Sequence, residues 1–254
     1  MKEKLYTIPL NDAVNAADEC PLCFALKEIE DSQLEYVLGS CASYMESDTR
    51  DMTDKAGFCR RHFKDMYDYG NTLGNGWILK THYLKVIDEM DDVFKKFTPS
   101  KTSLKDRISG KKPPNPLVGW LREKESSCFI CKQVNEMYDR YVDTFFYLYK
   151  NDKAFKGKIT EGKGFCLPHF ADLCEAADEK MSDKELSEFY DLMKPLMINN
   201  MKRIQGDISW FVDKFSYENR DKDWKNSRDA VQRGMQKLKG GYPAASKLKN
   251  TKQS

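Results

Sequence analysis

The sequence predicts an all-α fold: two tandem three-helix units followed by a C-terminal extension. Apolar residues recur at helical spacing along most of the chain, and one Cys/His pattern occurs twice. The one short alternating stretch, residues 5–10, contains Pro9, which argues against a strand. The 254 residues, 32% charged and 40% apolar, suit a helix-rich globular protein with two similar halves.

The overall composition excludes several classes of protein. The net charge is only +2, from 42 basic and 40 acidic side chains, which argues against a polyanion-binding surface over the whole molecule. No run of about eighteen apolar residues exists, so we expect no membrane-spanning segment. The first residues lack the apolar core of a signal peptide, and we therefore expect a cytoplasmic protein whose thiols stay reduced.

A duplicated motif contains most of the cysteine and histidine residues. The first copy has the pair CPLC at 20–23 and the segment GFCRRH at 57–62, whose cysteine, Cys59, lies 36 residues after Cys23. The second copy has CFIC at 128–131 and the segment GFCLPH at 164–169, whose cysteine, Cys166, lies 35 residues after Cys131. The copies are offset by 108 residues at the first pair and 107 at the second, which indicates an internal repeat.

Each copy supplies three thiols and one imidazole, the ligand set of a closed tetrahedral zinc site. CxxC and CxxH at helix starts place both side chains of a pair within one turn, where the helix dipole also favours thiolate. We expect one structural Zn²⁺ site per copy, formed when the loop between the helices brings the two pairs together. The predicted ligands are Cys20, Cys23, Cys59 and His62 in the first copy, and Cys128, Cys131, Cys166 and His169 in the second.

Two alternatives use the same ligands. Three thiolates and one histidine can also hold an iron–sulfur cluster, and a single binuclear site shared between the halves would need the same eight residues. A thioredoxin-type dithiol requires a preceding strand, and a zinc deaminase requires an HxE motif; the sequence shows neither. We predict no catalytic residue, and whether the protein is an enzyme stays open.

The chain divides at its proline-rich and basic segments. We expect a first helical metal-binding repeat over residues 1–97, a Pro/Lys-rich linker over 98–116, a second repeat with an aromatic extension over 117–232, and a basic flexible tail over 233–254. Prolines at 113, 114 and 116 forbid a continuous helix in the linker. The tail has six basic residues and no acidic one.

Three helices are expected in each repeat: one beginning at CxxC, one beginning at CxxH, and a long packing helix. Pro21 suits a first helical turn, because its missing N–H costs nothing there. Gly57 and Gly164 permit the tight turn before each CxxH pair. The polar stretches 39–56 and 150–163 are expected to be loops. The apolar stripes that define the helices are Leu26, Ile29, Leu34, Val37 and Leu38; Trp77, Leu84, Ile87, Met90 and Phe94; Val134, Met137, Tyr138, Tyr141, Val142, Phe145 and Leu148; and Leu186, Phe189, Tyr190, Met193, Met197, Met201, Ile204, Ile208, Phe211 and Phe215.

The remaining unusual residues favour structural interpretations. Cys41 and Cys174 lie outside the repeat, and we expect them to be small buried apolar side chains. His82 has no matched ligand array around it, so we interpret it as a hydrogen-bonded structural histidine. Aromatic and basic residues alternate over 210–229, which can favour nucleic-acid binding, but acidic residues dilute the charge. We expect this segment to fold back on the helices, with Asn226 or Ser227 capping a last short helix.

Several longer motifs carry a resemblance to a known family. They are the opening KEKLYTIPLNDA, the CPLC pair, SYME at 43–46, GFCRRH, NTLG at 71–74, GFCLPH, KFSYENRD and WKNSRD. Together they resemble a family of uncharacterised bacterial proteins, a domain of unknown function known mainly from anaerobes, over nearly the whole chain. The resemblance implies that the eight predicted ligands match the family's Cys/His positions. It implies no activity, and an anaerobic setting is compatible with an iron–sulfur cluster.

The sequence thus predicts a cytoplasmic, metal-binding helical protein that acts as an interaction or scaffold module for a protein partner. The first alternative is an iron–sulfur or redox protein that uses the Cys/His sites. The second is a nucleic-acid-binding regulator that uses the basic tail. The sequence does not define a substrate or an oligomeric state.

Overall fold

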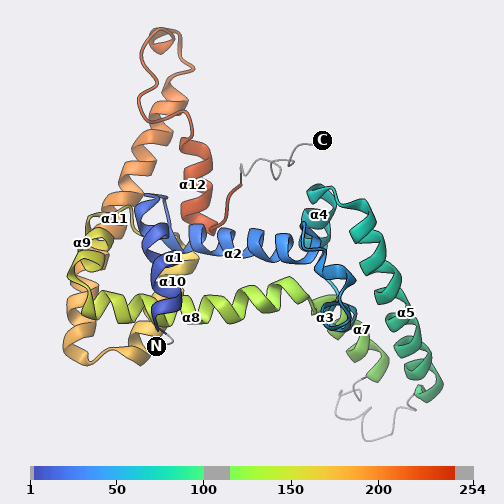
Figure 1. Cartoon of the computed structure of the whole chain (residues 1–254). Coiled ribbons are helices and arrows are strands. Elements are labelled where there is room, and N and C mark those ends of the chain that lie inside the picture. The colour runs from blue at the N-terminus through green and yellow to red at the C-terminus, as the bar shows by residue number, and fades with distance from the viewer. Residues whose placement is uncertain (1–2, 100–114, 244–254) are drawn as a thin grey trace, which may run out of the picture. The chain divides into compact units, whose positions relative to one another are not determined.

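The computed structural model describes residues 3–99 and 115–243. These ranges contain eleven α-helices, two short 3-10 helices and no strand, so the predicted all-α class is confirmed (Figure 1). None of these described helices combines the length and apolar character needed to cross a membrane.

The described residues form two compact units that do not follow the two sequence repeats. Unit 1 contains the residues up to Ile29 and those from Glu136 onwards, and unit 2 contains those from Glu30 to Asn135. Two long helices, α2 (Pro21–Leu38) and α8 (Phe129–Asn151), contribute residues to both units.

Unit 1 is built around the second half of α8 and the longest helix of the chain. Besides its parts of α2 and α8, it contains α1 (Glu3–Asn15), α9 (Lys153–Glu161), α10 (Leu167–Lys180), α11 (Asp183–Asp213), η2 (Tyr217–Asn219) and α12 (Ala230–Lys239). A capping box between Ser182 and Glu185 starts α11, and Pro195 lies inside it. Edge-to-face aromatic contacts around Phe145 fill the core, with Phe155 and Phe165 as partners.

Unit 2 contains the end of α2 and the start of α8, with shorter helices between them. These are η1 (Ser43–Met45), α3 (Ser47–Ala56), α4 (Arg60–Tyr69), α5 (Thr72–Lys96) and α7 (Pro116–Ser126). The Asn71 side chain caps α5 by accepting from the Gly74 amide, and α3 packs on α5. Asn115 caps α7 in the same way.

Several expected loops are helices. The stretch 39–56 contains η1 and α3, and the stretch 150–163 contains α9. Residues 5–10, for which Pro9 argued against a strand, lie in α1. Of the expected tail, residues 233–239 belong to α12, and residues 244–254 lie outside the described residues, as do linker residues 100–114. The polar composition of these stretches predicted loops. Short polar helices form there because tertiary packing outweighs their weak intrinsic helix propensity.

The long third helices of the two repeats differ in burial. In α11 four residues of the predicted stripe are buried, and the others within the helix are half-buried; the buried ones are Phe189, Met193, Met197 and Ile204. In α5 the expected packing stripe is partly wrong: Ile87 is 57% exposed and Phe94 53% exposed. Helical periodicity identifies an apolar face, but it does not say whether another element of the chain covers that face.

Candidate metal centres

The eight predicted ligands gather into two groups of four, but the groups cross the sequence repeats. Cluster 1 consists of Cys20, Cys23, Cys166 and His169. Cluster 2 consists of Cys59, His62, Cys128 and Cys131. Within each cluster the ligand atoms all lie within 4.8 Å of one another. The expected pairing of CxxC with CxxH inside each copy is therefore wrong: each CxxC pair meets the CxxH pair of the other copy.

The helices that follow the CxxC pairs explain the exchange. With 18 and 23 residues, α2 and α8 are about 27 and 35 Å long. Each carries the chain out of the unit that holds its own CxxC pair before the next CxxH pair is reached. The segments expected to loop back are helices α3 and α9 instead. Cluster 1 therefore lies wholly in unit 1 and cluster 2 wholly in unit 2.

The two CxxH pairs share one local structure. Cys59 and Cys166 are the N-cap residues of α4 and α10, and each histidine lies one turn into its helix. The glycine two residues before each cysteine has a positive φ, 62° at Gly57 and 72° at Gly164. This left-handed conformation favours glycine and makes the tight entry that the sequence predicted.

The distances between ligand atoms match a single tetrahedral ion. In cluster 1, the Cys23 and Cys166 sulfurs are 3.7 Å apart, and His169 Nδ1 is 3.3 Å from Cys20 Sγ. In cluster 2, the Cys59–Cys131 sulfur distance is 3.8 Å, and the histidine Nδ1 lies 3.2 to 3.4 Å from the three sulfurs. Zn–S bonds of about 2.3 Å and a Zn–N bond of about 2.0 Å set tetrahedral edges of about 3.8 Å and 3.5 Å. All eight cysteines of the chain are free, so no disulfide competes.

Cluster 1 is more deeply buried than cluster 2. All four ligands of cluster 1 are buried, and Cys20 and Cys166 have no exposed surface. In cluster 2, Cys59 and Cys131 are only partly buried. Solvent therefore reaches two of the four ligands of cluster 2.

The thiols of each cluster do not ionise equally. Hydrogen bonds from the Cys20 and Cys23 thiols, with help from the backbone amide of His169, lower the pKa of Cys166 to about 4. Hydrogen bonds to Cys166 and Cys20, together with burial, raise the pKa of Cys23 far above its ordinary value. In cluster 1 one thiol therefore ionises more easily, and another less easily, than an ordinary cysteine. A divalent cation bound at the cluster would favour the thiolate form of its ligands.

The cluster 2 pKa values follow the same pattern. Burial opposes ionisation of Cys59, but the His62 amide and the neighbouring thiols outweigh it and hold the pKa of Cys59 below its ordinary value. Burial and the Cys128 thiol raise the pKa of Cys131 to about 12. Burial and the Arg61 charge lower the pKa of His62 to about 4, so its imidazole is neutral, the form that binds metals.

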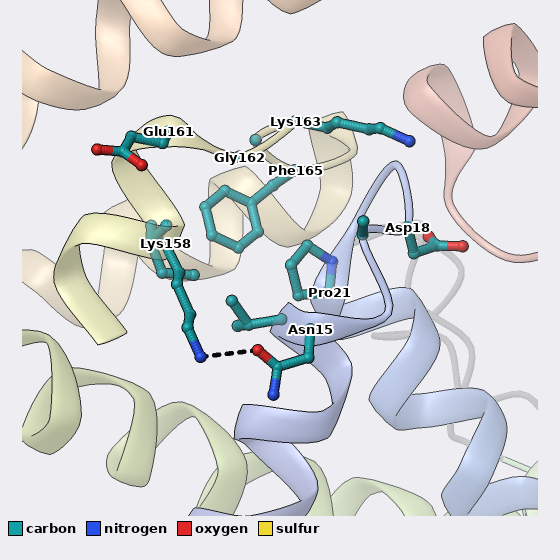
Figure 2. Close-up of a pocket in the computed structure, with 12 residues that line it drawn as sticks. Asn15, Asp18, Pro21, Lys158, Glu161, Gly162, Lys163 and Phe165 are labelled. Atoms are coloured by element: carbon teal, nitrogen blue, oxygen red, sulfur yellow. Dashed lines mark hydrogen bonds between the residues drawn. The ribbon is translucent and has the colours of Figure 1, made fainter. Parts of the chain in front are cut away.

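A small pocket lies beside the chain segments that lead into cluster 1 (Figure 2). Its volume is ≈ 400 Å³, and its walls include Asp18 and Pro21 on one side and Gly162 and Phe165 on the other. Lys158 donates a 2.8 Å hydrogen bond across it to Asn15. None of the cluster ligands lines this pocket, so we assign the pocket no part in metal binding.

The other singled-out residues lie outside both clusters. His82 makes a 2.9 Å hydrogen bond between its Nδ1 and the Asp54 carbonyl, as expected of a structural histidine. Cys41 is exposed and Cys174 partly buried, so the expectation of buried cysteines is wrong for Cys41. The predicted last helix exists as α12, but Asp229, rather than Asn226 or Ser227, occupies its N-cap position.

Sequence reasoning missed two charged residues beside cluster 1. Glu19, which directly precedes the predicted ligand Cys20, is 2% exposed, and Lys237, in the segment expected to be a flexible tail, is 1% exposed. Glutamate and lysine are rarely buried without partners. The one sequence feature that sets the surroundings of cluster 1 apart is Pro21, because the equivalent residue of the second copy is Phe129.

Comparison with known proteins identifies the family. A model of a family of unknown function, DUF6062, matches residues 1–245, and the chain belongs to this family. The resemblance predicted from the motifs is thereby confirmed. No curated protein and no solved structure matched the chain.

Proposed function

We propose that each cluster binds one Zn²⁺ ion as a structural site. The observation that carries this proposal is the geometry of the two quartets: three sulfurs and one Nδ1 nitrogen, with separations close to the edges of one zinc tetrahedron. Three protein thiolates and one imidazole leave no coordination position for a substrate. Such closed sites stabilise a fold and do not activate water.

The same distances favour one ion over an iron–sulfur cluster. In a polynuclear cluster the four ligands are divided between two or more irons, so the ligands on different irons lie farther apart than the edges of a single tetrahedron. Here all four ligand atoms of each cluster lie within 4.8 Å of one another. The observed 3.7 Å and 3.8 Å separations suit a mononuclear centre. Among mononuclear ions, zinc is the usual occupant of a site with three thiolates and one histidine.

Elemental analysis and absorbance spectroscopy test the proposal. Protein purified without oxygen and without added metal should carry two equivalents of zinc, two being the number of quartets, and should be colourless. A brown protein with visible absorbance and iron in place of zinc would contradict the zinc assignment. Substituting Co²⁺ should give the intense visible bands of tetrahedral thiolate coordination.

We further propose that the zinc-stabilised helices serve as a cytoplasmic scaffold for a protein partner. The eight free thiols are compatible with a reducing compartment. Exposed apolar side chains on α5, including Leu84, Ile87 and Phe94, support an interaction role, because large exposed apolar groups mark contact surfaces.

Photo-crosslinking in cells tests the scaffold role. A photoreactive amino acid at Ile87 should give discrete protein adducts, whereas the same group at the exposed Lys184 of unit 1 should give none. Equal labelling from both positions would contradict a specific surface on α5. RNase and DNase treatment would separate protein adducts from nucleic-acid adducts.

A further inference from the structure

The two clusters differ in how their CxxC and CxxH segments are joined. In cluster 2, the Phe129 amide, next to Cys128, donates a 2.8 Å hydrogen bond to the Gly57 carbonyl, two residues before Cys59. This bond ties the two ligand-bearing segments together directly. No side chain is needed, because the donor and the acceptor are both backbone groups.

Cluster 1 cannot form the equivalent bond. The residue after Cys20 is Pro21, which has no backbone N–H. The equivalent acceptor would be the Gly164 carbonyl. The repeat has therefore lost its backbone connection at cluster 1, although the ligands are held equally close.

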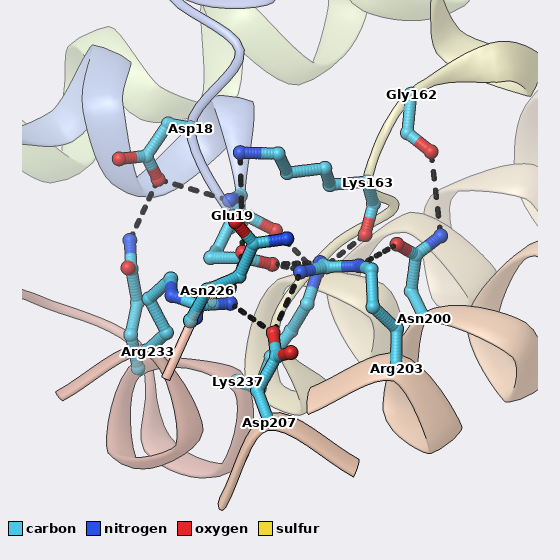
Figure 3. Close-up of polar contacts among 12 residues, drawn as sticks. Asp18, Glu19, Gly162, Lys163, Asn200, Arg203, Asp207, Asn226, Arg233 and Lys237 are labelled. Carbon is cyan, nitrogen blue, oxygen red and sulfur yellow. Dashed lines mark hydrogen bonds and ion pairs between the residues drawn. The ribbon is translucent and has the colours of Figure 1, made fainter. Parts of the chain in front are cut away.

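Lys237, on α12, occupies the place of the missing connection (Figure 3). Its ammonium group donates to the carbonyl of Glu19, next to Cys20, and lies 3.5 Å from the carbonyl of Phe165, next to Cys166. It also donates a 2.5 Å hydrogen bond to the Lys163 carbonyl, on the other side of Gly164. One buried cation thus bridges both segments of cluster 1.

Further polar contacts fix α12 to the same segment. Gln236 donates a 2.7 Å hydrogen bond to Asp18 Oδ1, the oxygen that also accepts from the Cys20 amide at 2.9 Å. The Glu19 carboxylate contacts Arg233 at 3.5 Å (Figure 3). Through these contacts α12, the last helix of the described residues, holds Asp18 and Glu19, the two residues before Cys20.

The end of α12 also covers the sulfur atoms. Gly240 has a φ of 74°, and a Cβ at this position would lie 3.4 Å from Cys166 Sγ and 3.6 Å from Cys23 Sγ. Gly240 therefore places bare backbone against the cluster, where a side chain would be strained. This cover accounts for part of the complete burial of the cluster 1 thiols.

Charge adds to the geometry. A zinc ion with three thiolates and one neutral imidazole carries one net negative charge. In a buried site such a charge requires a nearby cation. Lys237 supplies one within the bridge itself.

We propose that α12 is a latch that retains the metal of cluster 1, with Lys237 as the positioning residue that replaces the backbone hydrogen bond lost at Pro21. The proposal rests on the proposed metal site. It assigns the two clusters different exchange behaviour: release from cluster 1 requires α12 to undock, whereas cluster 2 releases metal without that step.

Cysteine alkylation during metal removal tests the latch on the full-length, zinc-loaded protein. Excess EDTA removes the metal while N-ethylmaleimide traps freed thiols, and mass spectrometry follows each cysteine. The variant K237M removes the bridge. K239M, an exposed lysine of the same helix, is the matched control, and Q236A removes only the Asp18 contact.

We expect K237M to accelerate alkylation of Cys20, Cys23 and Cys166 about tenfold, and Q236A about threefold, because local opening governs exchange. Cluster 2 cysteines should be unaffected, and K239M should behave as wild type. If K237M does not fold, as judged by circular dichroism, Q236A carries the test. Wild-type rates in both variants, or equal acceleration of both clusters, would overturn the latch alone. Wild-type protein whose cluster 1 thiols gain no protection from zinc would overturn the metal site and the latch with it.

Discussion

Cluster 1 and cluster 2 have the same four ligand types and nearly the same spacing, yet the chain holds them differently. Cluster 2 joins its segments by a backbone hydrogen bond and leaves Cys59 and Cys131 partly exposed. Cluster 1 has lost that bond to Pro21 and is buried under a helix from the C-terminal part of the chain. The comparison teaches that two clusters with the same four residue types can be held by different elements of the chain, one by a backbone hydrogen bond and the other by contacts from α12.

The largest expected effects on zinc content and stability come from removing one ligand from each cluster. We expect C166S to expose Cys20 and Cys23 to alkylation, and C59S to expose Cys128 and Cys131, each with loss of one zinc. Each substitution should lower the free energy of unfolding by more than about 5 kcal/mol, because structural zinc contributes on the order of 10 kcal/mol. Zinc content, thermal melting and alkylation of each cysteine measure these effects.

The same two variants also test which CxxC pair shares a cluster with which CxxH pair. If each CxxC pair instead shared a metal with the CxxH pair of its own sequence copy, C166S would free Cys128 and Cys131 and leave Cys20 and Cys23 protected. That pattern would contradict the observed clusters. Exposure of all five remaining ligand cysteines in each variant would indicate one cooperative site.

The sequence predicted the ligands but not their partners, and the reason is physical. Residue types at fixed spacing define each CxxC and CxxH pair locally, so Cys20, Cys59 and the other ligands could be recognised. Which pairs meet depends on where α2 and α8 end and on whether α3 and α9 form. These are tertiary outcomes, because short polar helices form only when the rest of the fold packs against them.

The all-α class was predictable from the helical spacing of apolar residues, but the burial of each helix was not. The stripe of α11 indicated a long helix and the structure confirms it, including Pro195 within the helix. The similar stripe of α5 also forms a helix but stays partly exposed. The role of Lys237 had no local signal, since a lone lysine in a basic segment normally predicts a solvated surface.

The second prediction concerns the charge network beneath α12. Glu19 is 3% exposed at its side chain and pairs with Arg203 at 2.5 Å. We expect E19Q to lower the free energy of unfolding by about 3 kcal/mol at neutral pH, because it leaves the buried Lys237 and the partly buried Arg203 and Arg233 without this acidic partner. Urea denaturation of zinc-loaded protein measures it. An unchanged midpoint would contradict a stabilising role of this network.

The pH dependence of the same network has a definite sign. Burial opposes ionisation of Glu19, but the hydrogen bond and charge of Arg203, with Lys237 and Lys163, hold the pKa of its carboxyl below the ordinary value. Its contribution is therefore complete above the ordinary carboxyl pKa and is lost as the pH falls through the lower, folded-state value. The stability difference between wild type and E19Q should shrink accordingly in acid.

The third prediction compares the matched glycines of the two copies. A Cβ at Gly57 would lie 2.9 Å from the His82 ring, whereas a Cβ at Gly164 would lie 3.0 Å from the flexible Met197 sulfur. Both have positive φ, so we expect G57A to cost about 2 kcal/mol and G164A somewhat less. Thermal melts compare them. Adding H82A should recover part of the G57A loss, and additive effects would show that only backbone strain matters.

The smallest expected effect comes from the substitution P21A. It tests whether cluster 1 can form the backbone hydrogen bond that joins the two segments of cluster 2. P21A restores a backbone N–H at the position equivalent to Phe129. While Lys237 is present, the restored amide competes with it for the same space between the segments, so P21A alone should leave metal retention unchanged.

In the K237M background the restored amide is free to donate to the Gly164 carbonyl. We expect the double variant P21A/K237M to release cluster 1 metal about threefold more slowly than K237M, the equivalent of one modest backbone hydrogen bond. Alanine also relaxes the unfolded chain relative to proline, which by itself acts in the opposite direction. A slower release therefore cannot come from chain entropy. Equal or faster release would show that Lys237 stabilises cluster 1 by its charge rather than by replacing the lost bond.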